Sequence, residues 1–170
     1  RATGLLPRLL HERLDEIGID FTVLYSSVGL ACVGHADERT RRGACRALNT
    51  YLAEMLDGHG DRMCAAAVIP THTPDEAIAE LDHAVGALGF KAVMLNSLVA
   101  RALPERGPGA QWLDVLALDS AHDYDPVWQR CVDLGVSPTF HGGGIGFGTR
   151  MSTTNYVHNH LGNFAATGDG

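Results

Sequence analysis

His141 is the residue whose type and position point most directly to chemistry. It ends an apolar run at residues 136–140 and is followed by three glycines. A residue at the carboxyl end of a strand in a parallel α/β protein faces the mouth where such proteins build their sites, and a neutral imidazole is a common ligand of divalent metals. Position alone leaves two interpretations open, a metal ligand or a strand-end histidine that only makes a hydrogen bond.

Two arginines, Arg101 and Arg106, lie in a connection of residues 96–123, which is far longer than the usual few residues. Such long connections in compact domains are commonly functional, and this one follows a strand, so it belongs to the edge where sites form. A guanidinium can hold a carboxylate through two parallel hydrogen bonds. We therefore predict Arg101 and Arg106 as substrate-binding residues, although a loop arginine is more often only solvated.

A histidine near the end of the chain, His160, is our candidate catalytic residue. If the chain is helical from Asn155 onward, Tyr156, His160 and Phe164 form an i, i+4 ladder, and His158 lies elsewhere on that helix. We predict that His160 transfers a proton or holds a substrate oxygen. The alternative is a histidine that only stabilises a neighbouring loop.

The elements that must position these residues follow an α/β pattern. Apolar runs of strand length recur at residues 19–25, 63–69, 91–95 and 136–140, with helical patterns between them. This alternation predicts βαβ units in a parallel sheet, and the nearly continuous apolar runs indicate strands covered on both faces. Because Pro138 cannot donate to a ladder, we expect the last strand to pair fully only from Thr139 onward.

Three helices are predicted between the strands. Thr73 and Glu76 match a capping box for a helix that Gly89 ends, and Pro126 and Gly135 bracket a helix that starts at Asp125. A third helix, at about residues 38–56, carries one apolar face formed by Ala44, Leu48, Leu52 and Met55.

Composition excludes several classes of protein. The 170 residues are 45% hydrophobic and 19% charged, which is typical of a globular protein. The net charge of −7 argues against nucleic acid as a partner, and no apolar stretch approaches the roughly 20 residues of a membrane span. The four cysteines are widely separated and form no CxxC pair, so we expect a reducing, cytoplasmic location.

Several motifs resemble the amidohydrolase-related (amidohydrolase 2) family, typified by aminocarboxymuconate semialdehyde decarboxylase. They are LGFKAVML at residues 88–95, YDPVW at 124–128, LGVSPTFH at 134–141 and NYVHNHLG at 155–162. The resemblance implies a (β/α)8 TIM barrel with a divalent metal, in which His141 matches the histidine ligand that ends the fifth strand. The family's His-x-His pair would precede Arg1 and its later aspartate would follow Gly170. Residues 1–170 therefore look like an interior piece of one barrel domain, with about four βα units.

The resemblance implies a metal-dependent enzyme, and the sequence does not separate two reactions. We place hydrolysis of C–N or C–O bonds in a small carboxylate-type substrate first, and non-oxidative decarboxylation of an aromatic or semialdehyde acid second. We expect zinc, with manganese as the other choice, a small-molecule substrate and no membrane partner, and we leave homo-oligomerisation open. A flavodoxin-like domain whose glycine-rich loop holds an anionic ligand is the alternative from another class.

Overall fold

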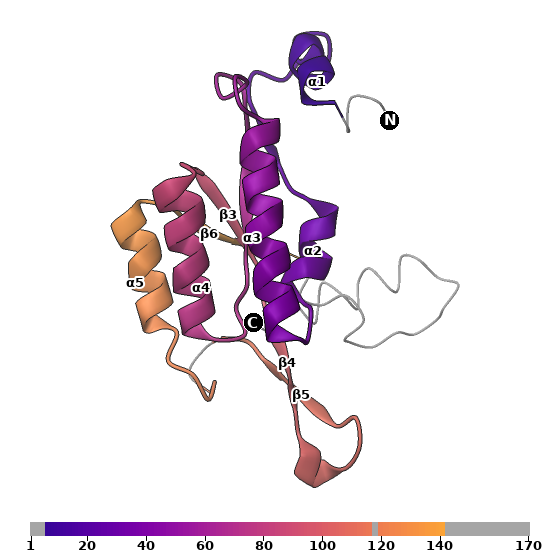
Figure 1. The fold of residues 1–170 in the computed structure, drawn as a ribbon, viewed down its shortest axis with the longest axis vertical. Coiled ribbons are helices and arrows are strands. Elements are labelled where there is room, and N and C mark those ends of the chain that lie inside the picture. Colours follow the sequence, from indigo (N-terminus) through magenta and orange to yellow (C-terminus); the bar gives the residue numbers. More distant parts are fainter. Residues whose placement is uncertain (1–5, 117–118, 142–170) are drawn as a thin grey trace, which may run out of the picture.

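Strands and helices alternate along the chain in a computed structural model, which describes residues 6–116 and 119–141 (Figure 1). Four parallel strands form one sheet, in the order β1 (Thr22–Leu24), β2 (Met63–Ile69), β3 (Ala92–Leu95) and β6 (Pro138–Phe140). The helices are α1 (Pro7–Arg13), α2 (Ser27–Val33), α3 (Glu38–Met55), α4 (Pro74–Leu81), its π-helical continuation (Asp82–Ala87) and α5 (Asp125–Leu134). No helix in this part of the chain is both long and apolar enough to cross a bilayer.

The strand order separates two of the predicted folds. Each strand of the sheet pairs with the next parallel strand along the chain, as consecutive strands of a (β/α)8 barrel do. A flavodoxin-like sheet has the order 2-1-3-4-5, which places the first strand between the second and the third. The flavodoxin-like alternative is therefore wrong for this chain.

The sheet is curled, as a contact between side chains from its two edge strands shows. The Tyr25 hydroxyl, directly after β1, lies 3.2 Å from the Thr139 hydroxyl of β6. Neighbouring strands lie about 4.8 Å apart, so three spacings would separate β1 from β6 by about 14 Å in a flat sheet. The contact therefore lies across a concave face, which in a closed barrel is the interior.

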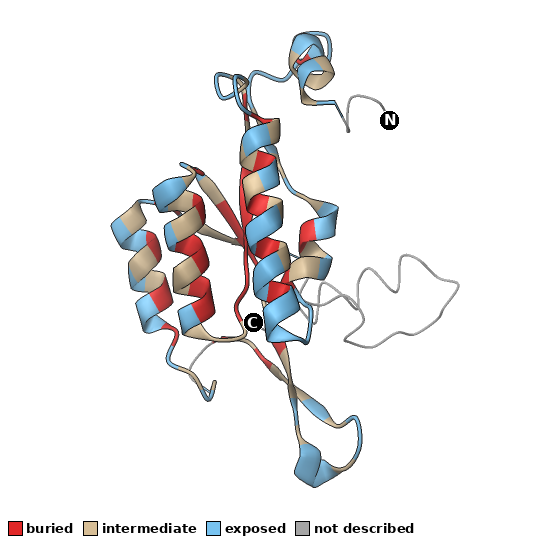
Figure 2. Cartoon of the chain, in the orientation of Figure 1, coloured by how far each residue is buried: buried red, intermediate tan, exposed pale blue. Residues whose placement is uncertain are grey.

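The convex face carries the larger core. Ala67 and Ile69 of β2 and Leu95 of β3 are fully buried there against side chains of α4 and α5, such as Leu81 and Val127. Figure 2 shows buried residues along the faces of α3, α4 and α5 that meet the sheet. This packing explains why β2 is apolar at nearly every position.

The concave face is covered in part by α2. Val68 and Met94 lie on this face with Val33 of α2 and Cys45 of α3. A Cβ at Gly29 would lie only 2.3 Å from Cγ1 of Val68, so a glycine is required where α2 crosses β2. Helix α2 was not predicted from the sequence.

The buried face of helix α3 is shifted from the predicted one. Leu52 is buried as predicted, and Leu48 and Met55 are partly buried against the core, but the other fully buried residues are Arg41, Cys45 and Asn49. The amide of Asn49 donates to the Val68 carbonyl at 3.0 Å and accepts from the Val68 N–H at 2.8 Å. Because β1 pairs with β2 only as far as Ala65, this side chain replaces the missing strand and satisfies the backbone of β2.

The start of α4 follows only half of the predicted capping box. The Thr73 hydroxyl accepts from the Glu76 N–H, as predicted. The carboxylate of Glu76 does not return to the backbone N–H of Thr73. It instead forms a bidentate pair with the guanidinium of Arg41, at 2.8 and 2.9 Å, with both side chains buried. Glu76 thus joins α4 to α3.

The long connection after β3 contains an antiparallel hairpin that the sequence analysis missed. Its strands are β4 (Val99–Ala102) and β5 (Gln111–Asp114), and the 3₁₀ turn Pro104–Arg106 lies near its tip. Figure 1 shows that the hairpin extends away from the helices and the sheet. Its strands have only four residues each, and they lack a continuous β-branched or aromatic pattern.

Candidate active site

His141 lies at the carboxyl end of β6, as predicted. Its backbone N–H donates to the Leu95 carbonyl at 3.0 Å, which continues the pairing of β6 with β3. Side chains alternate along a strand, so His141 shares the concave face with Thr139, two residues earlier. The His141 side chain is exposed on this face.

An aromatic ring from the opposite edge of the sheet meets His141. The ring of Tyr25 lies edge-on to the imidazole, with centroids 6.2 Å apart and an interplanar angle of 78°. The Tyr25 hydroxyl donates to the Thr139 hydroxyl, which donates in turn to the Val93 carbonyl at 2.6 Å. Tyr25 ends the predicted apolar run 19–25, but no pattern in the sequence predicts its contact with β6, because that contact depends on the curl of the sheet.

Arg101 makes contacts within the protein that the substrate-binding prediction did not anticipate. Its Nε and Nη2 each lie 2.8 Å from a carboxylate oxygen of Asp114, which is fully buried. Its Nη1 donates to the His72 carbonyl at 2.7 Å, and Nη2 donates to the Tyr124 hydroxyl at 2.9 Å. Arg101 thus ties the hairpin to the loop after β2, and its predicted contact with substrate stays a prediction.

Asp114 gathers further donors from the same connection. Its carboxylate accepts from the Leu116 N–H at 2.9 Å and from the Ser120 hydroxyl at 2.8 Å. The Tyr124 hydroxyl donates to the Thr71 carbonyl at 2.7 Å, and burial raises the pKa of this phenol. Asp114 was missed as a site residue, and the only sequence signal was an opposite charge 13 residues after Arg101.

Arg106 is not brought together with Arg101. It lies in the exposed 3₁₀ turn near the tip of the hairpin, which projects from the rest of the fold (Figure 1). The substrate-binding prediction for Arg106 remains untested. His160 and residues 142–148 of the glycine-rich loop lie outside the described residues, so the catalytic prediction for His160 also remains a prediction.

Buried polar groups gather where β2 and β3 end. The pKa of His72 is lowered from 6.5 to about 4, mainly by burial and also by the charges of Arg41 and Arg101, while Glu76 opposes them. Within the described part of the chain, three atoms here are buried without a hydrogen-bond partner, namely His72 Nδ1, Thr71 Oγ1 and Ser97 Oγ. The His72 imidazole is therefore neutral at pH 7.

A divalent cation fits His141 as one ligand, since an exposed imidazole is a suitable donor. The described residues contain no group of three or more His, Cys, Asp or Glu side chains placed to hold a metal. Burial raises the pKa of the Cys45 thiol to about 12, and this cysteine belongs to the apolar cluster with Val68 and Met94. Among the described residues, His141 is the metal ligand that we assign.

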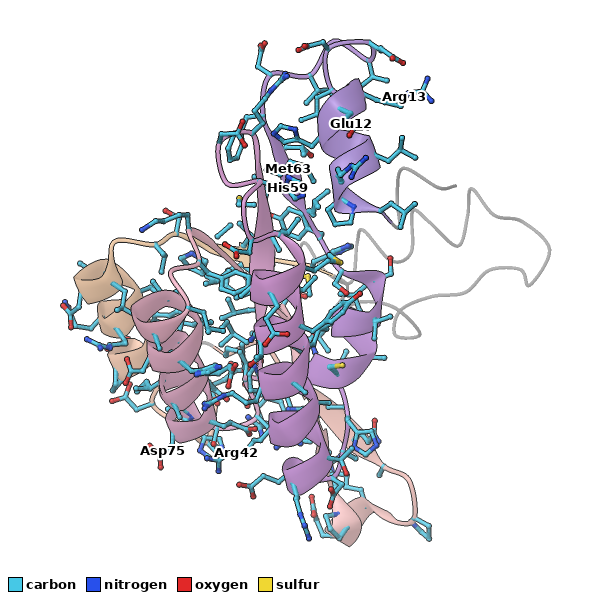
Figure 3. All side chains as sticks on the ribbon, turned by 45° about the horizontal axis from the view of Figure 1, so that its top comes forward. Glu12, Arg13, Arg42, His59, Met63 and Asp75 are labelled. Atoms are coloured by element: carbon cyan, nitrogen blue, oxygen red, sulfur yellow. The ribbon has the colours of Figure 1, made fainter. Side chains whose placement is uncertain are left out.

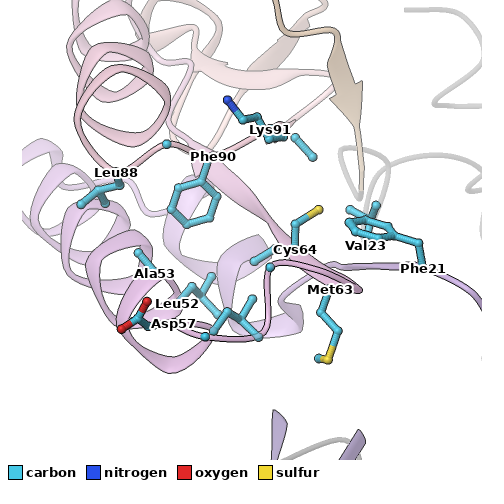
Figure 4. A pocket seen from close by; sticks show the side chains of 16 residues that line it. Phe21, Val23, Leu52, Ala53, Asp57, Met63, Cys64, Leu88, Phe90 and Lys91 are labelled. Atoms are coloured by element: carbon cyan, nitrogen blue, oxygen red, sulfur yellow. The ribbon is translucent and has the colours of Figure 1, made fainter. Parts of the chain in front are cut away.

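The amino ends of the strands border a cavity, but few polar groups line it. A cavity of about 570 Å³ at the amino ends of the strands has mostly apolar walls that include Phe21, Val23 and Phe90 (Figure 4). His11, His59 and Asp61 also meet at this edge, and Figure 3 places His59 and Met63 at the end away from Asp75 and Arg42. Parallel α/β barrels place their chemistry at the carboxyl ends of the strands, so we place the site at His141.

Comparison with known proteins identifies the family. The amidohydrolase-2 family profile matches residues 12–166. Decarboxylase orsB of Emericella nidulans is 31% identical over 100 residues, which make up 58% of this chain and 26% of that protein.

Solved structures agree on the fold. A dihydroxybenzoic acid decarboxylase from Polaromonas sp. JS666, with bound manganese and the inhibitor 2-nitroresorcinol, matches with a TM-score of 0.60 and 27% identity, over 76% of this chain and 36% of that one. 5-Carboxyvanillate decarboxylase LigW from Sphingomonas paucimobilis matches with a TM-score of 0.62 and 17% identity, over 93% of this chain and 43% of that one. The chain thus spans less than half the length of these relatives. It belongs to the amidohydrolase-2 family, with the fold of part of a (β/α)8 barrel.

Proposed function

We propose that the protein containing this chain is a metal-dependent carboxy-lyase that removes CO2 from an aromatic carboxylic acid. The observation that carries this proposal is the exposed imidazole of His141 on the concave face, at the carboxyl end of β6. The sequence alone led us to place hydrolysis first. The relatives named above are decarboxylases, and they reverse that order.

Manganese is the metal we propose first. The Polaromonas relative carries bound manganese, whereas our expectation from the sequence was zinc with manganese as the other choice. We propose His141 as the ligand that this chain supplies. A bound divalent cation would act as a Lewis acid that polarises an oxygen of the substrate.

The reaction breaks the bond between a ring carbon and the carboxyl carbon. The electron pair of that bond stays on the ring carbon, CO2 leaves, and the ring carbon takes up a proton. We propose that the proton passes through His160, because histidine is the side chain that most often serves as a general acid or base. Tyr25 and His141 would border the substrate on the concave face, and Asn96, which follows β3, would lie nearby.

The test is a substrate panel with the full-length polypeptide that contains this chain, loaded with Mn²⁺ or Zn²⁺. CO2 release from hydroxybenzoic acids and carboxyvanillate is compared with cleavage of the corresponding amides and esters. We expect CO2 release from at least one aromatic acid, dependent on the metal, and no cleavage of amides or esters. Hydrolysis of an amide or ester without CO2 release would favour the hydrolase instead.

A further inference from the structure

Tyr25 lies on the concave face and contacts a strand at the other edge of the sheet. It follows the short strand β1, and its side chain is 43% exposed. Its hydroxyl reaches Thr139, which is 114 residues later in the sequence. The Thr139 hydroxyl donates its own proton to the Val93 carbonyl, so it can only accept from Tyr25. The phenol is therefore held in one direction across the curl of the sheet.

The held ring restrains His141. Its edge-on geometry, with centroids 6.2 Å apart, lies within the range favoured by aromatic pairs. The backbone of His141 is fixed by its bond to Leu95. Within the described residues, the His141 imidazole makes no side-chain hydrogen bond, and the ring of Tyr25 is an aromatic neighbour that packs against it.

We propose that Tyr25 is a positioning residue that orients the His141 imidazole for metal binding, an inference that rests on the proposed function. Histidine ligands usually depend on an outer partner for their orientation, and loss of such a partner costs roughly 10- to 100-fold in metal affinity. Here the partner is an aromatic ring from the opposite edge strand, held by Thr139. The orientation of the His141 imidazole therefore depends on the curl of the sheet, which brings Tyr25 to it.

The experiment measures the Kd for Mn²⁺ of the full-length polypeptide and four variants by titration calorimetry. Tyr25→Leu removes the ring, whereas Tyr25→Phe and Thr139→Val each remove only the hydrogen bond. Tyr51→Leu is the matched control, because Tyr51 is another exposed tyrosine, and it lies on α3. We expect Tyr25→Leu to weaken Mn²⁺ binding by about tenfold, the two conservative variants to weaken it less, and the control to bind normally.

Two further readouts separate positioning from general stability. The double variant Tyr25→Phe/Thr139→Val should bind Mn²⁺ no more weakly than either single variant, because both changes break the same bond. Saturating Mn²⁺ should restore full metal occupancy in Tyr25→Leu, measured by elemental analysis, with the same stoichiometry as in the wild type. Wild-type affinity in Tyr25→Leu would overturn the inference and leave the proposed function intact. If the wild-type polypeptide bound no divalent metal, the proposed function would fail and the inference with it.

Discussion

Among single residues, His141 carries the most specific functional assignment. Its backbone continues the pairing of β6 with β3, and its imidazole lies on the concave face beside the ring of Tyr25. We predict that His141→Ala in the full-length polypeptide lowers metal affinity by more than the roughly 10- to 100-fold that loss of an outer partner costs. Metal content after dialysis, measured by elemental analysis, checks this.

The matched control for His141 is His59→Ala, because His59 lies at the amino edge of the sheet (Figure 3). The control should retain its metal. If His141→Ala kept wild-type metal occupancy, the ligand assignment would be wrong.

Arg101 is the residue for which sequence and structure suggest different roles. As a tie to the buried Asp114, its loss would leave an unpaired carboxylate in the interior. Arg101→Ala should therefore destabilise the protein by roughly 3–5 kcal/mol. Arg106→Ala is the control, and as an exposed residue it should change stability by no more than about 0.5 kcal/mol. Denaturant unfolding measures both.

The substrate-binding role for Arg101 predicts another result. In that case Arg101→Lys would raise KM while the free energy of unfolding and the resistance of residues 96–123 to proteolysis stayed the same. Loss of both stability and resistance would support the tie.

Position was enough to predict that His141 follows the end of a strand, whereas the contacts around it were not predictable. Asp114 meets Arg101 only because a hairpin forms, and Tyr25 meets Thr139 only because the sheet curls. Both contacts depend on tertiary structure that no local pattern in the sequence encodes.

At the scale of elements, the loop after β2 should make stability depend on pH. The pKa of His72 is about 4 in the folded protein, against 6.5 for an ordinary histidine. The unfolded chain therefore binds a proton between pH 6.5 and 4 that the folded protein does not take up. We predict that the free energy of unfolding is not reduced by His72 above pH 6.5, and that it falls as the pH drops from 6.5 toward 4.

The measurement for His72 is the free energy of unfolding at pH 7 and pH 5, for wild type and His72→Gln. Glutamine does not titrate, so the variant should lose less stability between these two pH values. An equal loss in both proteins would show that other groups cause the pH dependence.

The sequence predicted the positions of several helices and strands more closely than it predicted which of their residues are buried. β2 occupies the predicted residues 63–69, and α5 ends where Gly135 adopts φ 66°. The buried face of α3 was predicted only in part, because Arg41 and Asn49 are buried through partners on other elements. Hydrophobic periodicity does not report a polar side chain that a distant carboxylate or strand satisfies.

At the scale of the molecule, the first strand and its flanks leave large apolar side chains uncovered on the concave face. The large apolar residues Ile19, Phe21, Val23 and Tyr25 alternate along β1 and its flanks, and all four are exposed. β1 is also an edge strand. Exposed apolar edges of this kind promote association.

We predict that residues 1–170, when expressed alone, form aggregates that bind a hydrophobic dye. Replacing Phe21 and Val23 with threonine should reduce the aggregation, because Val23 is exposed on β1 and Phe21 is exposed directly before it. Size-exclusion chromatography with light scattering measures this. A monomeric wild-type chain that melts cooperatively would contradict the prediction.

The most direct test of the proposed chemistry follows the carboxyl carbon itself. The full-length polypeptide, loaded with Mn²⁺, is incubated with hydroxybenzoic acids labelled with ¹³C at the carboxyl group, and NMR follows the label. We predict that the label from at least one acid appears as CO2 and bicarbonate in an amount equal to the decarboxylated phenol, and that His141→Ala abolishes its release. Retention of the label in every acid by a folded, metal-loaded protein would contradict the assignment of this chain to an aromatic acid decarboxylase.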